Sequence, residues 1–437
     1  MITAEGYPYR RKYGIVWGGR MDAAEEGMPM QQAADLDLPY LTMDEDAFAA
    51  DPFPHFAAAR AQHPWLARWT LGYVVTDYKA MRDLFATEDR MGMLYDNIVE
   101  IMDAKGTPWG NFQQRHMLNM SGMPHKRIRD ILAPSFTPRQ ANNHRPLMRE
   151  VITGLLDEWA PKQSFDFEEF ASYFPITVMC RLIGASPDVI PGLRSAMEAI
   201  GLSTSMDPRW LPAMQEGVVT MENFVDGLIA DRRANPRSGE EPDLLDLLLE
   251  TQGGGGLSDR ELADILIFLF VAGYDTSKNM LTLTMWELLE RPEMYRRCAE
   301  DHAFARSVVE EAFRIHSTTS SQRVLKEDIV YRDVLLEKDA IVWFPLSVAT
   351  HDPRYADHFE SFDPERQQKN PHIGFGLGAH ICLGQYIARA QIHEGLHLIA
   401  QRILNPRSSG PQGYRPFPGT WGLRGLPVEF DVAEVPA

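Results

Sequence analysis

The sequence is poor in cysteine, which excludes the disulfide-rich secreted folds. Its 437 residues include three cysteines, Cys180, Cys298 and Cys382, and none of them stands in a C-x-x-C clip. Disulfide frameworks need a dense and even set of cysteines. An odd, sparse set favours a reducing compartment, and we expect a cytoplasmic protein.

Long hydrophobic runs are also absent. The longest strongly apolar run covers residues 265–272, whereas a helix needs about 20 apolar residues to span a bilayer. The first twelve residues carry charges where a secretory signal needs its apolar stretch. We therefore expect no secretory signal and no membrane anchor.

Positive charge is scarce. The chain has 43 Lys and Arg against 61 Asp and Glu, a formal net charge of −18. Nucleic acids and anionic lipids attract basic surfaces, so we expect no nucleic-acid partner. With 44% hydrophobic and 10% aromatic residues, however, the chain can bury a large globular core.

Helical periodicity dominates the chain. A capping box, Ser258-Asp-Arg-Glu261, predicts the start of a long helix whose body, residues 262–289, is apolar on most sides and therefore buried. The other predicted helices cover residues 45–62, 77–86, 124–133, 145–158, 167–183, 211–234 and 385–399. Short β-like pieces occur at residues 73–76, 329–331, 340–344 and 427–432.

These patterns predict a mostly α fold, a single large helical domain with small β-sheets. We expect the domain to cover residues 38–437 and to follow an N-terminal extension, residues 1–37, that lacks periodicity. Between residues 85 and 123 the pattern breaks into Met-, Gly- and aromatic-containing sequence, which predicts a long functional or mobile loop.

The most informative segment is Phe375-Gly-Leu-Gly-Ala-His-Ile-Cys-Leu-Gly384. Cys382 stands just before a predicted helix, where free N–H groups and the helix dipole stabilise a thiolate. Gly376, Gly378 and Gly384 let the loop lie flat against another group. A lone cysteine between glycines is more often an inert buried residue, so the surrounding pattern has to decide.

That segment resembles the haem-binding pattern of the cytochrome P450 family, F-G-x-G-x-[HR]-x-C-x-G, and every fixed position is met. The resemblance implies that the cofactor is haem b, iron protoporphyrin IX, with Cys382 as the metal ligand and Phe375 and the three glycines around it. A thiolate ligand gives haem iron electron density that promotes cleavage of the O–O bond. Dioxygen is then the expected co-substrate.

Within the long buried helix, Ala272-Gly-Tyr-Asp-Thr276 resembles the family's oxygen-activation motif. Gly273 weakens a helix and Thr276 can divert a backbone hydrogen bond, so we expect a local distortion. Reduction of dioxygen consumes protons, which makes Asp275 and Thr276 the candidate catalytic residues. The alternative is an Asp that pairs locally and a Thr that bonds back to its own helix.

Glu311-Ala-Phe-Arg314 places opposite charges three residues apart on one helix. An exposed pair contributes only about 0 to 1 kcal/mol, so by itself it is weak evidence of a site. The resemblance implies that this E-x-x-R pair joins Arg366 in a structural network that holds the cysteine loop.

Four further residues match family positions for partners of the haem propionates: His125 and Arg129 in an H-x-x-x-R helix, Arg323, and His380. A buried carboxylate needs such cationic or hydrogen-bonding partners, although each residue alone is more often a solvated surface charge.

The substrate pocket is predicted to be apolar, because Met and aromatic side chains suit an adaptable wall. Its candidate residues are Met91, Met93, Leu94, Tyr95, Trp109, Phe112, Phe270 and Ala272. After Arg314 the chain reads Ile-His-Ser-Thr-Thr-Ser-Ser-Gln, where many relatives have a proline, and this departure is expected to alter the wall opposite the oxygen-activation helix.

The implied activity is insertion of one oxygen atom from O2 into a small hydrophobic substrate. No flavin, nicotinamide or iron-sulfur module is recognisable, so electrons are expected from a ferredoxin, supplied by a ferredoxin reductase and NAD(P)H. Lys126, Arg127 and Arg389 could meet an acidic ferredoxin. The alternatives are a peroxide-driven peroxygenase and a non-catalytic haem-binding sensor or carrier.

Overall fold

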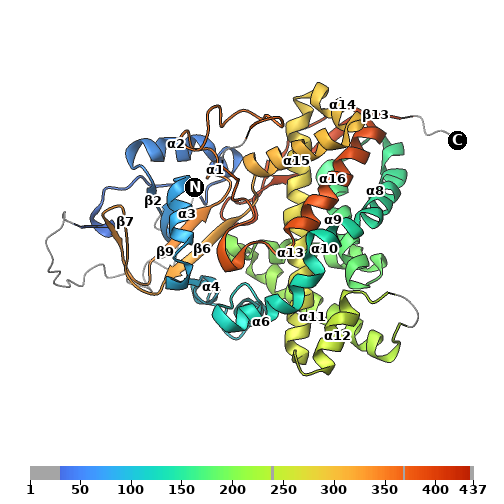
Figure 1. Cartoon of the computed structure of the whole chain (residues 1–437), viewed down its shortest axis with the longest axis horizontal. Coiled ribbons are helices and arrows are strands. Elements are labelled where there is room, and N and C mark those ends of the chain that lie inside the picture. Colours follow the sequence, from blue (N-terminus) through green and yellow to red (C-terminus); the bar gives the residue numbers. More distant parts are fainter. Residues whose placement is uncertain (1–29, 238–240, 368–369, 434–437) are drawn as a thin grey trace.

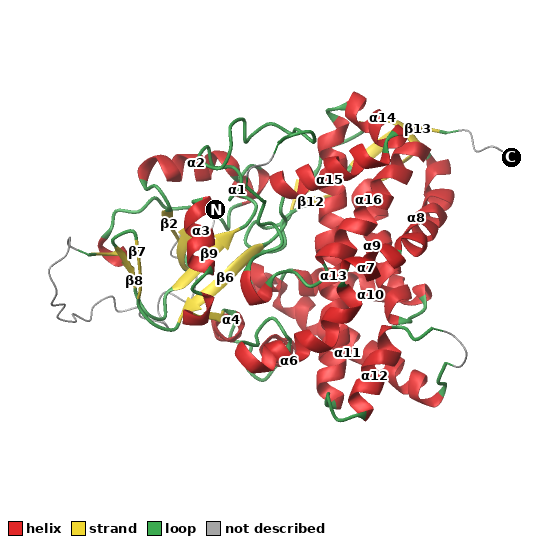
Figure 2. Ribbon diagram, in the orientation of Figure 1, coloured by secondary structure: helices red, strands yellow, loops and turns green. Residues whose placement is uncertain are grey.

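The computed structural model describes residues 30–237, 241–367 and 370–433. Helices form the larger part of the molecule; strands such as β6 (Ser320–Leu325) and β9 (Ile341–Pro345) lie on the opposite side, whereas β13 (Pro427–Val432) lies beside the helices, next to α14 (Pro292–Glu300) (Figure 1; Figure 2). The prediction of a mostly α fold with small sheets is confirmed. No helix in these described ranges is both long and apolar enough to cross a membrane.

The predicted helices are present with small shifts at their ends, and the structure adds helices that were not predicted, at residues 95–101, 108–115, 138–143, 190–201, 244–253 and 292–300. In chain order the helices are α1 (Asp46–Ala50), α2 (Phe53–Gln62), α3 (Tyr78–Phe85), α4 (Tyr95–Ile101), α5 (Pro108–Arg115), α6 (Gly122–Leu132), α7 (Pro138–Asn143), α8 (Arg145–Trp159), α9 (Phe167–Ile183), α10 (Ile190–Gly201), α11 (Leu211–Ala234), α12 (Leu244–Gly253), α13 (Asp259–Leu289), α14 (Pro292–Glu300), α15 (His302–Ile315) and α16 (Gln385–Arg402). The predicted helix 45–62 is divided in two at Pro52, which cannot donate a backbone hydrogen bond.

The strands are β1 (Gln31–Gln32), β2 (Leu66–Trp69), β3 (Gly72–Val75), β4 (Met91–Met93), β5 (Ser164–Asp166), β6 (Ser320–Leu325), β7 (Ile329–Tyr331), β8 (Val334–Leu336), β9 (Ile341–Pro345), β10 (Ile403–Ser408), β11 (Gly413–Tyr414), β12 (Leu423–Arg424) and β13 (Pro427–Val432). They form one five-stranded sheet, β2-β3-β9-β6-β4, and the smaller sheets β1-β8-β7, β10-β13-β5 and β11-β12. β1 belongs to the expected N-terminal extension, of which residues 1–29 lie outside the described residues.

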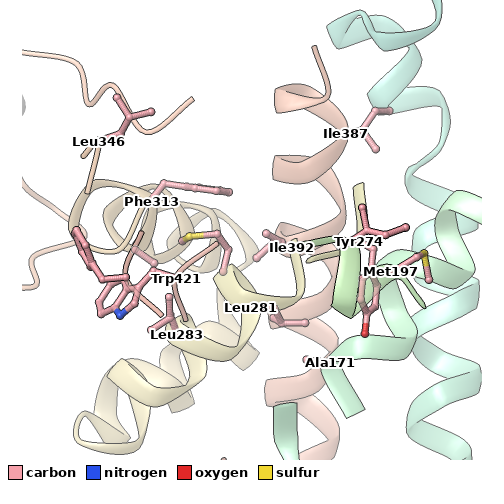
Figure 3. Packing of buried hydrophobic residues seen from close by; sticks show 14 of the residues in the cluster. Ala171, Met197, Tyr274, Leu281, Leu283, Phe313, Leu346, Ile387, Ile392 and Trp421 are labelled. Atoms are coloured by element: carbon pink, nitrogen blue, oxygen red, sulfur yellow. The ribbon is translucent and has the colours of Figure 1, made fainter. Parts of the chain in front are cut away.

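Helix α13 occupies the middle of the helical part (Figure 1). It starts at the predicted capping box: Ser258 accepts a hydrogen bond from the Glu261 backbone, and the Glu261 carboxylate accepts one from the Ser258 N–H. Residues of α9, α10, α13 and α16 meet in one apolar core, where Ile392 and Leu281 are both buried (Figure 3). The prediction of a long buried helix is confirmed.

The prediction of a long loop over residues 85–123 is wrong. The segment contains β4, α4 and α5, and its Trp109 and Phe112 are buried. The start of α5 has a local signal that was overlooked: Thr107 caps the helix by accepting from Gly110 N, and Pro108 occupies the first turn. These helices are too short to show a clear 3.6-residue period.

Candidate active site

An internal cavity brings together segments that lie far apart in the sequence. Cys382 and its loop form one wall, Ala272 and Thr276 of α13 another, and Tyr95 and Phe112 a third. The segment between α15 and β6, residues 317–323, completes the lining. The sequence predictions of a cysteine loop, an oxygen-activation motif and an aromatic wall therefore refer to one cavity.

The cysteine loop is folded back on itself directly before α16. Cys382 N donates to Phe375 O at 2.8 Å, and Gly384 is the N-cap of α16. Gly376 and Gly378 have φ of +74° and +72°, a region that side chains with a Cβ rarely adopt. Two of the three glycines are therefore required by backbone conformation.

Burial raises the pKa of the Cys382 thiol above its ordinary value, against the expectation that the helix terminus alone favours a thiolate. The Gly384 backbone, Arg129 and Arg389 oppose this shift but do not reverse it. Cys382 stands two residues outside the N-cap, where the helix dipole is weak. A bound metal ion would favour the thiolate form of this sulfur, because metal binding displaces the thiol proton.

The four predicted propionate partners all line the cavity. The rings of His125 and His380 stack with centroids 4.0 Å apart. Arg323 is 3% exposed and donates to Ser321 Oγ at 2.6 Å and Gln322 O at 2.9 Å, while Arg129 donates to Ile381 O at 2.7 Å.

Two of these four residues, His125 and His380, each have a ring nitrogen that is free to form a hydrogen bond. His125 Nε2 and His380 Nδ1 are buried and make no hydrogen bond with another described residue. Burial, with His125, Arg323 and Arg129 nearby, lowers the pKa of His380 to about 3. A buried sulfur beside two arginines and two unsatisfied histidines fits a group that has a metal ion at its centre and carboxylates at its edge.

The sequence analysis missed one acidic residue beside this loop. Glu88 accepts a hydrogen bond from Ala379 N, and a Cβ at Gly378 would collide with the Glu88 carboxylate. The two residues are 290 positions apart, and no local pattern connects them.

The oxygen-activation motif lies on an uninterrupted part of α13, so the expected distortion is wrong. Thr276 Oγ1 donates to Ala272 O at 3.0 Å, which is the back-bonded alternative. Gly273 serves packing instead, because a Cβ there would lie 3.0 Å from the side chain of Met179 on α9. Thr276 nevertheless lines the cavity.

Asp275 is held in a buried ion pair. Its Oδ2 accepts from Arg415 Nη2 at 2.7 Å, and its Oδ1 lies 3.5 Å from Lys278 Nζ. Lys278 is fully buried and also donates to Glu168 Oε1 at 2.5 Å. The sequence signal for this cluster was a lysine in the middle of an apolar helix, because a buried ammonium group needs a carboxylate partner.

Glu311, Arg314 and Arg366 meet as predicted. Arg314 donates to both carboxylate oxygens of Glu311, at 2.8 and 2.7 Å, and Arg366 Nε lies 3.4 Å from Glu311 Oε1. Arg314 also donates to Phe359 O and Ser361 O. Because Glu311 and Arg314 are 2% and 0% exposed, the pair is not a surface decoration.

The predicted apolar wall is right for some residues and wrong for others. Met93, Tyr95, Phe112 and Ala272 line the cavity, whereas Met91, Leu94, Trp109 and Phe270 do not. Phe270 stands two residues before Ala272, a rotation of about 200° that turns it away toward Phe224, 5.5 Å between ring centroids. Met91 is 3% exposed and lies in the core.

The expected ferredoxin contacts differ in exposure. The side chains of Lys126 and Arg127 are 63% and 45% exposed and pair with Asp130 and Glu261. Arg389 is 22% exposed, donates to Glu310 Oε1 at 2.8 Å and lies over the Phe375 ring. Lys126 and Arg127 therefore offer more accessible charge than Arg389.

Comparison with known proteins agrees with this site. Residues 202–403 match the model of the family described as Cytochrome P450. The chain is 29% identical to luteothin monooxygenase of Streptomyces thioluteus over 403 residues, 91% of this chain and 97% of the relative. It is 28% identical to nocardicin C N-oxygenase of Nocardia uniformis subsp. tsuyamanensis, over 89% and 96% of the two chains.

Solved structures of cytochrome P450s also resemble the fold of this chain. P450BioI, in complex with a hexadec-9Z-enoic acid-ligated acyl carrier protein, superposes with a TM-score of 0.80 at 25% identity and covers 88% of this chain and 100% of its own. The myxobacterial cytochrome P450 CYP267B1, in complex with myristic acid, gives 0.80 at 25% identity over 90% and 99%.

A mostly helical fold, a cysteine loop beside a cavity against the central helix, and an E-x-x-R network are the features that the sequence predicts for a haem-thiolate enzyme. The chain is similar over most of its length to cytochrome P450 monooxygenases, and residues 202–403 match that family's model.

Proposed function

We propose that the protein binds haem b through Cys382 and inserts one atom of O2 into a small hydrophobic substrate, with electrons from a ferredoxin. The observation that carries this proposal is the cavity, which combines the buried Cys382 sulfur with Thr276 and an apolar wall. When bound, haem supplies the redox-active iron at which dioxygen is activated. Arg129, Arg323, His125 and His380 would hold its propionates.

The protein's own residues would then handle protons and water. The Thr276 hydroxyl lines the cavity and can pass a proton once it leaves the Ala272 carbonyl. Asp275 can supply that proton only when its carboxylate is released from Arg415 and Lys278. Apolar side chains such as Phe112 and Leu269 exclude bulk water from the cavity.

Replacing Thr276 with alanine should leave haem content unchanged and lower the ratio of product formed to oxygen consumed by about 100-fold, the lower end of the contribution of a positioned proton donor. Oxygen uptake and product are measured together. Thr284→Ala is the matched control, because Thr284 also back-bonds, to Met280 O, but does not line the cavity. If the ratio of product formed to oxygen consumed were the same in both variants, Thr276 would have no role in proton delivery.

Reversing the charge of Lys126 should slow electron transfer from a ferredoxin by roughly tenfold at low salt, with a smaller effect at high salt, because steering by exposed charges is screened. Stopped-flow reduction of the haem measures this rate. Lys79→Glu is the control, since Lys79 is similarly exposed and also pairs with an Asp four residues on. Identical rates in the two variants would place the docking surface elsewhere.

The peroxygenase alternative predicts a different electron source. If the proposed function is right, turnover with ferredoxin, ferredoxin reductase and NAD(P)H should exceed turnover with hydrogen peroxide alone, because Thr276 and Asp275, once released from their present partners, would deliver protons to dioxygen. The comparison is made on one enzyme preparation and one substrate. Faster turnover with peroxide would favour the alternative.

A further inference from the structure

One stretch of the cavity wall is polar, although the pocket was expected to be apolar. Residues 317–322 read Ser-Thr-Thr-Ser-Ser-Gln, leave α15, enter β6 and all line the cavity. The backbone here is fixed by other contacts, since Thr318 O accepts from Trp421 N and Ser320 and Ser321 pair with β9. The position of the side chains against the cavity therefore follows from the fold.

Three of these hydroxyls have no partner within the described residues. Ser317 donates to Gly374 O and Ser321 accepts from Arg323, so both are engaged. No hydrogen bond joins the side-chain hydroxyls of Thr318, Thr319 and Ser320 to any other described residue.

Much of the rest of the wall is apolar, although scattered polar residues such as Gln113, His116 and Ser203 also line it. Phe268, Leu269 and Ala272 of α13 present apolar side chains to the cavity, and Tyr95 and Phe112 add aromatic rings. Residues 317–322 are therefore a continuous run of hydroxyl-bearing and amide side chains in a lining that is otherwise largely apolar. A plain hydrocarbon would leave the three hydroxyls dehydrated and unpaired, which opposes its binding.

We propose that the substrate carries hydroxyl, keto, ester or amide groups along one edge and that Thr318, Thr319 and Ser320 recognise them. The inference rests on the proposed function and deepens it from a hydrophobic substrate to an oxygenated one with an apolar face. Each hydroxyl can donate and accept a hydrogen bond, so this wall can bind several kinds of oxygen- or nitrogen-containing group. A site built to bond a substrate hydroxyl rejects the analogue that lacks it.

The test measures dissociation constants of the holoenzyme, by calorimetry, for matched pairs of probes: cyclododecanol with cyclododecane, and androstane-3,17-diol with androstane. The wild type should bind the oxygenated member at least tenfold more tightly, which corresponds to 1.4 kcal/mol. The triple variant Thr318→Val, Thr319→Val, Ser320→Ala keeps the shape of the wall. It should weaken binding of the oxygenated member and strengthen binding of the hydrocarbon.

Two controls separate recognition from structure. Thr318→Ser with Thr319→Ser retains the hydroxyls and should retain the preference, and Met117→Leu, elsewhere in the same cavity, should not change the ratio. Equal affinity of the wild type for both members, or an unchanged ratio in the triple variant, would overturn the inference. The carbon monoxide spectrum of the same preparations tests thiolate ligation separately, so failure of one proposal is distinguishable from failure of the other.

Discussion

Replacing Cys382 with alanine will abolish thiolate-ligated haem and reduce monooxygenation to background. The reason is that a bound haem iron would need a protein ligand here, and Cys382 is the only cysteine among the described residues that lines the cavity. The carbon monoxide spectrum of the reduced protein and its bound iron measure the effect. Activity should fall by at least about 1,000-fold, because the ligand also sets the electron density at the iron.

Cys298→Ala is the matched control for this variant. Cys298 is a buried free cysteine on α14, and burial raises the pKa of its thiol to about 12, so it stays a neutral core residue. We expect the Cys298 variant to keep the thiolate spectrum, with a modest loss of stability from lost packing. A Cys382 variant that retained the wild-type spectrum would contradict the assignment of the ligand.

Replacing Arg314 with leucine should destabilise the protein by about 3 to 5 kcal/mol and strongly reduce the yield of haem-loaded enzyme. The substitution removes the bidentate partner of the buried Glu311 carboxylate and leaves it only the longer contact with Arg366, and breaking a buried ion pair carries this penalty. It also removes the hydrogen bonds to Phe359 O and Ser361 O. Urea unfolding measures the loss, which is a large fraction of the about 5 to 15 kcal/mol typical of a folded domain.

The chain contains its own control for this prediction. Glu293-Met-Tyr-Arg296 has the same E-x-x-R spacing on α14, but its two side chains are 81% and 57% exposed. Arg296→Leu should therefore change stability by less than about 1 kcal/mol. If Arg314→Leu and Arg296→Leu had the same free energy of unfolding, the ion pairs of Glu311 would not stabilise the fold.

Most of the helices and much of the cavity could be predicted from the sequence because their signals are local. The capping box at Ser258 and Glu261 marks the start of α13, and the glycines around Cys382 mark a backbone that needs positive φ. The E-x-x-R pair is also local, although only the fold shows that Arg366 reaches it.

The features that were missed depend on contacts between distant segments. Arg415 pairs with Asp275 across 140 residues, and Glu88 meets Ala379 of the cysteine loop across 291. Propensity and periodicity carry no information on such pairs. The apolar wall was partly wrong for a related reason, because Phe270 is hydrophobic but its helix turns it into the core.

The central claim is that Cys382 holds a haem iron as its thiolate, and the carbon monoxide spectrum of the reduced wild-type protein tests it most directly. We predict one haem per chain and the red-shifted main absorption band that thiolate ligation gives. A band at the position typical of histidine-ligated haem, or a folded protein that takes up no haem, would contradict the account.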